Sequence, residues 1–165
     1  MLALLGAACG SASEQAGRVH ARVTRPPKDT IRFEAPARAR RCHEGTGSGA
    51  LLLQGSSEGN GVVVWLREGG SGVDSQASGV WPLLQRGDTV SPRGATVGVR
   101  YMMGDVPHGL PLDSGAVEVR RADGVLTVVA RGTGLDVTAA GRVGLEASFD
   151  AVPLERDTVS CRPRP

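Results

Sequence analysis

Aromatic side chains are scarce in this chain, at 3% of its 165 residues. Hydrophobic residues still make up 40%, so a core can form, and it must be built mainly from Val, Leu and Ala. Residues 1–48 carry an excess of basic charge, but Phe33 is their single aromatic. Binding of single-stranded nucleic acid combines basic charge with aromatic stacking, so we expect no nucleic-acid partner.

Long apolar runs and metal-binding motifs are also missing. No run is long enough to cross a bilayer as a helix, and apolar residues nowhere recur at helical spacing over about a dozen residues. No CxxC or HxxxH spacing occurs. Cys42 and His43 are adjacent, so their side chains would diverge on a strand. We therefore expect no metal and no cofactor.

The sequence is rich in two-residue alternation. Ile31, Phe33 and Ala35 alternate with charged residues, and 143–151 alternates in the same way. Glycine is frequent, at 24 residues, which favours tight turns. Such segments recur about every 8–12 residues, a spacing typical of sandwiches and barrels. We predict an all-β fold, a single antiparallel β-sandwich over residues 30–162, with a closed antiparallel β-barrel as the alternative.

Local signals refine this prediction. Ala50–Leu53 and Val62–Leu66 are apolar runs joined by a segment with Asn-Gly chemistry, which indicates a hairpin of central strands. The segment from Val80 to Gln85 is at best an edge strand, because Pro82 cannot donate to a ladder. Residues 104–111, with two prolines and two glycines, are expected to form a loop.

The N-terminus has an apolar stretch over residues 2–8, ending in small residues, then Cys9 and a polar tract. This order resembles a bacterial lipoprotein signal, in which the cysteine is lipidated and becomes the mature N-terminus. Gly6 stands where Leu, Val or Ile is usual, so a plain secretory signal remains the alternative. The resemblance implies a signal segment at 1–9, a lipid anchor at Cys9 and a flexible tether at 10–29.

The same resemblance implies a location. Gly10 follows the cysteine, whereas Asp at that position favours retention in the inner membrane. An outer-membrane lipoprotein that faces the periplasm, held to the membrane through its lipid anchor, is therefore expected, with secretion as the alternative. The alternating pattern of residues 113–154 also resembles the β-sandwich domains of uncharacterised bacterial envelope lipoproteins, a likeness that carries no catalytic motif.

Cysteine usage agrees with export. Without Cys9, the chain keeps Cys42 and Cys161, an even pair that brackets most of the remaining domain. A pair of this kind in an exported protein favours a disulfide. Closing so long a loop would restrict the unfolded chain by about 4–5 kcal/mol in the chain-entropy model.

Two motifs suggest chemistry that the rest of the chain does not support. The segment Leu110–Ala116 resembles the signature of retroviral-type aspartic proteases, in which Asp113 would activate water. The later apolar-apolar-Gly element of that family is missing, so Asp113 is expected in a turn. Residues 69–74 match half of a calcium-binding β-roll repeat, but a single copy cannot complete the calcium shell.

Three residues form the candidate ligand surface. Trp81 is expected to be exposed near an edge, whereas Trp65 lies in an apolar run and is expected in the core. Asp105 and His108 share a loop and could contact a ligand. No complete catalytic set is present, so we expect a non-catalytic envelope lipoprotein that binds a protein or carbohydrate. A small-ligand carrier with a barrel cavity is the alternative, and an aspartic hydrolase using Asp113 is a remote one.

Overall fold

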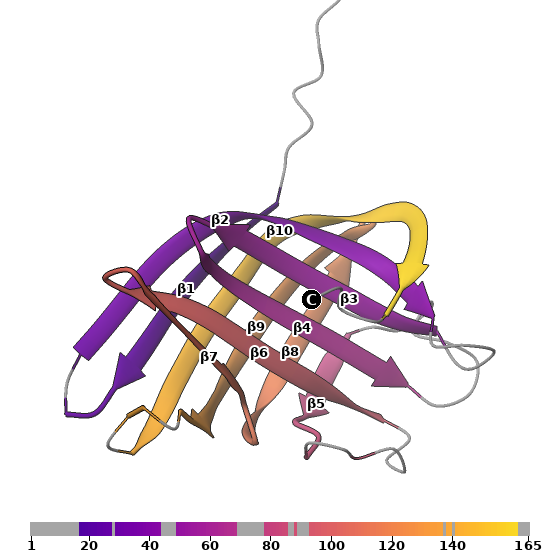
Figure 1. Ribbon diagram of the computed structural model, residues 1–165. Coiled ribbons are helices and arrows are strands. Elements are labelled where there is room, and N and C mark those ends of the chain that lie inside the picture. The colour runs from indigo at the N-terminus through magenta and orange to yellow at the C-terminus, as the bar shows by residue number, and fades with distance from the viewer. Residues whose placement is uncertain are drawn as a thin grey trace, which may run out of the picture.

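The computed structural model describes residues 17–27, 29–43, 49–68, 78–85, 88, 93–136, 138–139 and 141–161. These residues form strands and turns and no helix. The strands, labelled in Figure 1, are β1 (Gly17–Arg25), β2 (Asp29–His43), β3 (Gly49–Ser57), β4 (Asn60–Glu68), β5 (Gly79–Pro82), β6 (Arg93–Met103), β7 (Val106–Pro111), β8 (Ser114–Ala122), β9 (Val125–Leu135) and β10 (Arg142–Ser160).

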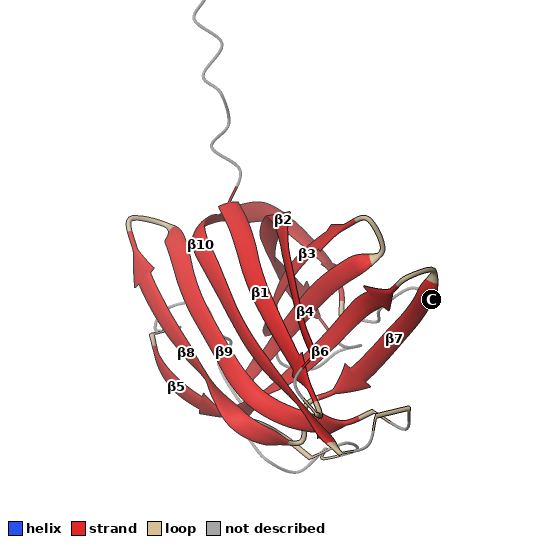
Figure 2. Ribbon diagram, turned by 90° about the vertical axis from the view of Figure 1, so that its left-hand side faces the viewer, coloured by secondary structure: helices blue, strands red, loops and turns tan. Residues whose placement is uncertain are grey.

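All these strands belong to one sheet with the order β5-β8-β9-β10-β1-β2-β3-β4-β6-β7. Neighbours are antiparallel, and an additional parallel pairing joins the C-terminal end of β10 to β2. The sheet bends over at β1 and β2, so that β8, β9 and β10 face β3, β4, β6 and β7 (Figures 1 and 2). The all-β prediction is confirmed, with the two layers of the sandwich formed by one folded sheet.

The sheet is not closed into a barrel, so the barrel alternative is wrong. Within the described residues, its two halves are bridged by the isolated pair Leu83 and Ala95, beside a hydrogen bond of 2.8 Å from Leu84 N to Ala95 O. The terminal strands β5 and β7 do not pair with each other. Residues 106–111 are strand β7 rather than loop, because an edge strand tolerates prolines that an inner strand would exclude.

One continuous core fills the space between the two layers. Its largest fully buried side chains are Trp81, Tyr101 and Phe149, and most of the others are Val, Leu and Ala. Inward-facing residues alternate with outward-facing ones along the strands, as in β6, where Val97 and Val99 are buried. The described interior is therefore occupied by the protein's own side chains.

The expectation of a tether over residues 10–29 is wrong for the described part of that range, residues 17–27 and 29. Gly17–Arg25 is an inner strand, paired with β10 on one side and with β2 on the other. Val19, Ala21 and Val23 are buried while the residues between them face outwards. Burying these three side chains stabilises the strand, so the domain begins at or before Gly17. Residues 10–16 lie outside the described residues.

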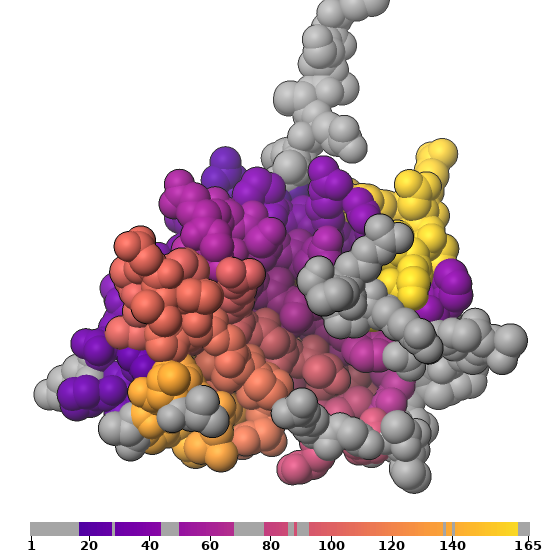
Figure 3. All heavy atoms as spheres, viewed as in Figure 1, coloured from indigo at the N-terminus to yellow at the C-terminus, as the bar shows by residue number. Residues whose placement is uncertain are grey.

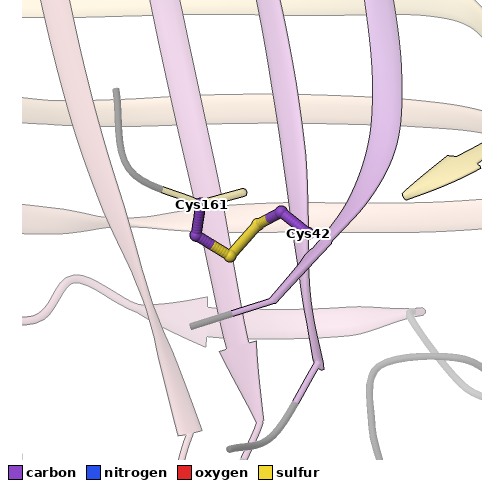
Figure 4. Close-up of a disulfide and its surroundings, with 2 residues drawn as sticks. All are labelled: Cys42 and Cys161. Atoms are coloured by element: carbon purple, nitrogen blue, oxygen red, sulfur yellow. A yellow bond between two sulfur atoms is a disulfide. The ribbon is translucent and has the colours of Figure 1, made fainter. Parts of the chain in front are cut away.

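The C-terminal end of β10 is held to the sheet by two interactions, a parallel pairing and a disulfide. Val159 lies opposite Cys42 in the parallel pairing with β2. A disulfide then joins Cys42 to Cys161, with their Cα atoms 4.9 Å apart (Figure 4). This is the pairing expected from the sequence. Both cysteines are buried in a small outer cluster with Ala50, and Trp65 packs against that cluster.

Two glycines in β9 let the chain that runs from β7 into β8 pass close to the backbone of β9. A Cβ atom at Gly134 would lie 2.5 Å from Cδ1 of Leu110 and even nearer to the carbonyl oxygen of Pro111. A Cβ at Gly132 would overlap the carbonyl oxygen of Ser114. Glycine is thus required at both positions for steric reasons. This close approach brings β7 beside the C-terminal end of β9.

Candidate functional site

An open groove of about 800 Å³ runs along β3, β4, β6 and β7, and we call it the outer groove. The layer that carries it faces the viewer in Figure 3. Val63, Gly98 and Pro111 lie side by side across β4, β6 and β7 and face outwards. Gly98 has no side chain, so the surface is hollowed between Val63 and Pro111.

Polar side chains border this apolar floor. Gln54, Thr96 and Arg100 are exposed and line the groove. None of these three side chains makes a hydrogen bond or an ion pair to another described residue. Asn60 differs, because its Oδ1 accepts a hydrogen bond of 2.9 Å from the backbone N of Met102 and so anchors the β3–β4 turn. The outer groove therefore offers unused hydrogen-bonding groups around an apolar floor.

The surroundings of Arg100 are unusual for a strand residue. Its cross-strand neighbours are Gly61 on β4 and Gly109 on β7, and Gly98 precedes it on the same face. Cross-strand side-chain pairs normally supply the partner for a charge on a sheet surface. Here three glycines leave the guanidinium without such a partner. A ligand can also approach the backbone closely where glycine replaces a side chain.

A second open groove, of about 600 Å³, lies on the outward face of β1, β2, β9 and β10. It differs from the outer groove in how its charged side chains are paired. Its charged groups mostly pair with one another. Arg22 and Arg131 both bind Glu146, at 2.6 and 3.2 Å, and these hydrogen bonds lower the pKa of Glu146. His20 lies 3.1 Å from Glu34. Charges that are already paired leave less for a ligand than those of the outer groove.

A polar cluster lies where β6, β7 and the segment after β9 meet. Both carboxylate oxygens of Asp136 accept short hydrogen bonds, from Tyr101 OH at 2.6 Å and from Thr138 Oγ1, also at 2.6 Å. Nδ1 of His108 lies 2.9 Å from Thr138 Oγ1, and the His108 ring stacks on Tyr101. Arg25 adds a cation 3.9 Å from Asp136. The cluster thus ties four segments of the chain together.

The pKa values of this cluster indicate how it is charged. Burial raises the pKa of Tyr101 to about 12, and the hydrogen bond to Asp136 acts in the same direction. Burial alone would raise the pKa of Asp136, but hydrogen bonds from Thr138 and Tyr101 outweigh it and hold the pKa well below its usual range. A carboxylate so well solvated by donors is a weak base. Asp136 therefore stays charged while it accepts the hydrogen bonds from Tyr101 and Thr138.

The predicted ligand surface does not come together as expected. Trp81 is fully buried, with the guanidinium of Arg93 4.3 Å from its ring centroid, so the expectation of an exposed Trp81 is wrong. Val80 and Pro82 face outwards, and alternation turns the residue between them inwards. Trp65 lies on the outward face, only partly buried, because its neighbours in β4 take the inward positions.

The other candidate residues have separate positions. Asp105 is exposed in the β6–β7 turn, whereas His108 points into the polar cluster. Asp113 forms an ion pair with Arg142 in the link between β7 and β8. Cys9 and residues 69–74 of the calcium-like motif lie outside the described residues.

Sequence reasoning missed the outer groove and the polar cluster. Gln54, Arg100 and Gly98 carry no motif, and only strand pairing makes them neighbours. Tyr101 and Asp136 are separated by 35 residues, so no local pattern links them. The one usable signal was the set of glycines inside strands, which often mark close approach of a backbone or a ligand.

Comparison with known proteins adds no family to this description. No family model matches the chain, no curated protein matches it, and no solved structure matches it. Among the described residues there is no helix long and apolar enough to cross a membrane. The same residues contain no group of three or more His, Cys, Asp or Glu side chains able to hold a metal ion.

Proposed function

We propose that this protein is a non-catalytic binding module of the bacterial cell envelope, anchored through lipid on Cys9, and that it binds its ligand in the outer groove. The observation that carries the proposal is the set of unused polar groups, those of Gln54, Thr96 and Arg100, around the apolar floor at Gly98. Sites that bind small ligands combine apolar surface with a few well-placed polar groups in this way.

The alternatives receive less support. A carrier of the barrel type needs an internal cavity, yet the space between the two layers is packed with side chains such as Tyr101, Phe149 and Trp81. An aspartic hydrolase needs a pair of carboxyl groups that share a proton. Asp113 instead has Arg142 as its partner.

Binding is tested by filling the floor of the groove. A Cβ at Gly98 would lie 3.2 Å from Cγ1 of Val63, a tight contact that a small shift can relieve, so Gly98→Val should fold and block the groove. Gly144→Val is the matched control. Gly144 is a strand glycine on the other layer, where a Cβ would meet nothing closer than 3.9 Å.

Both variants and the otherwise unmodified protein, each carrying Cys9→Ala so that no lipid anchor holds it to a membrane, are mixed with isolated bacterial envelopes and sedimented. The unmodified protein and Gly144→Val should sediment with the envelopes, and Gly98→Val should stay in solution. Circular dichroism and melting temperature establish that each variant is folded. Equal sedimentation of folded Gly98→Val, or no sedimentation of any form, would contradict binding through the outer groove.

The location is tested through its anchor. Cells that express the full chain should incorporate labelled palmitate into the protein, and the Cys9→Ala variant should not be labelled. The lipidated protein should fractionate with outer membranes. Equal labelling of both forms, or none in either, would refute the anchor at Cys9.

A further inference from the structure

We infer that the ligand of the outer groove is a carboxylate-bearing sugar, with the carboxylate bound by Arg100 and the ring hydroxyl groups bound by Gln54 and Thr96. This inference rests on the proposed function, because it names the ligand class of that same groove. It concerns an acidic sugar unit as such, whether free or part of a longer glycan.

Arg100 gives the outer groove a cationic group for an anionic ligand. Arg100 is the arginine of the groove and has no ion-pair partner among the described residues. Several arginines elsewhere on the outward faces contact carboxylates of the chain, as in the pairs Arg22–Glu146 and Arg40–Glu155. Three others, Arg32, Arg120 and Arg156, are exposed without such a contact among the described residues, but none of them lines the outer groove. A guanidinium binds a carboxylate through two parallel hydrogen bonds. An external carboxylate would give Arg100 the contact that Arg22 and Arg40 find within the protein.

The guanidinium of Arg100 is accessible to a ligand from the neighbouring strands. Gly61 and Gly109 flank Arg100 on the neighbouring strands. A Cβ at Gly109 would meet nothing closer than the carbonyl oxygen of Val99, at 3.7 Å. Packing therefore does not demand glycine at position 109. The missing side chain at Gly109 leaves the guanidinium of Arg100 accessible to a ligand from the side of the edge strand β7.

Other groups of the outer groove match the neutral part of a sugar. Gln54 and Thr96 each offer both a donor and an acceptor, which matches sugar hydroxyl and acetamido groups. Val63 and Pro111 present an apolar surface against which the C–H face of a sugar ring can pack. Among the described residues that line the groove, Arg100 and Glu58 are charged. A carboxylate, with a single negative charge, is therefore repelled less by Glu58 than a phosphate, which carries more negative charge.

The experiment uses two sugars that differ in the acidic group. N-acetylmuramic acid carries a lactyl carboxylate on the ring of N-acetylglucosamine, which is neutral. Each sugar is titrated into ¹⁵N-labelled protein, and amide shifts are followed by NMR. The acid should bind and shift the amides of Gly61, Gly98 and Arg100. The neutral sugar should bind about tenfold or more weakly, the effect of losing a charge-assisted hydrogen bond.

Variants identify the residue responsible. Arg100→Gln should reduce affinity for the acid about tenfold or more and leave the weak affinity for the neutral sugar unchanged. Arg22→Gln, which removes a paired arginine from the other layer, should change neither. Equal binding of both sugars, unchanged binding by Arg100→Gln, or no binding of the acid at millimolar concentration would overturn the inference.

An acidic peptide is the competing ligand, and hexaglutamate serves as its probe. Binding of hexaglutamate without binding of the sugar acid would overturn the sugar assignment. The two proposals fail separately. If Gly98→Val loses envelope binding and the sugar acid still does not bind, the ligand class is wrong and the binding function stands.

Discussion

The phenol of Tyr101 donates a hydrogen bond of 2.6 Å to the carboxylate of Asp136, which follows it by 35 residues. The bond joins β6 to the segment after β9, across the two layers of the folded sheet. It also fixes the protonation of both groups at neutral pH, because it favours a neutral phenol and a charged carboxylate.

The titration of Tyr101 can be measured directly, because it is the protein's one tyrosine. Tyrosinate absorbance near 295 nm should report a pKa of about 12 in the folded protein and about 10 in denaturant. Stability from this group is complete below about pH 10 and is lost as the pH rises through the folded value. Asp136→Asn should lower the folded pKa but leave it above 10, since burial persists. A folded pKa of 10 would contradict the burial of the phenol.

The contribution of Asp136 to stability depends on pH in the opposite direction. Its folded pKa is lowered, so its contribution to stability is present above its unfolded value of about 3.9 and is lost as the pH falls below it. Urea unfolding should show Asp136→Asn less stable by about 1–3 kcal/mol at pH 7. The difference should shrink as the pH falls from 5 to 2. A difference independent of pH would show that the carboxylate charge does not matter.

Gly134 tests the close approach of β7 to β9. Gly134→Ala places a Cβ against backbone at Pro111 and should cost about 1–3 kcal/mol, as overpacking does. Gly144→Ala, where the nearest atom is 3.9 Å away, should be neutral or slightly stabilising. Both are compared by urea unfolding. Equal stability of the two variants would mean that the crossing is looser than described.

The disulfide tests how the C-terminal end of β10 is held. Cys42 and Cys161 are 119 residues apart in sequence, so reduction should cost about 2–5 kcal/mol of unfolding free energy. The double variant Cys42→Ser with Cys161→Ser is the control, and a reductant should not change its stability. Two free thiols in denatured, unreduced protein would show that the bond does not form.

The sequence predicted the fold class because strand alternation is local. Val143 to Ala151 and the apolar runs of β3 and β4 signal strands without knowledge of their partners. Strand β1 was missed although Val19, Ala21 and Val23 alternate in the same way. The lipoprotein-like start suggested a tether, and that interpretation took precedence over the pattern.

The candidate site could not be predicted, because it depends on which strands are neighbours. Trp81 faces inwards and Trp65 faces outwards against the disulfide cluster, contrary to expectation, since the face of each strand is set by register rather than by residue type. Gly61, Arg100 and Gly109 become neighbours only through the pairing of β4, β6 and β7. No spacing in the sequence encodes that juxtaposition.

Chemical-shift mapping locates the ligand on the surface of the protein. Soluble glycan fragments released from bacterial envelopes are titrated into ¹⁵N-labelled protein, and the shifted amides are assigned. If the outer groove is the binding site, the shifts will be concentrated there, at Gly61, Gly98 and Arg100. Shifts concentrated instead around His108 and Asp136, or on the opposite layer around Glu146, would contradict binding in the outer groove, as would the absence of any shift.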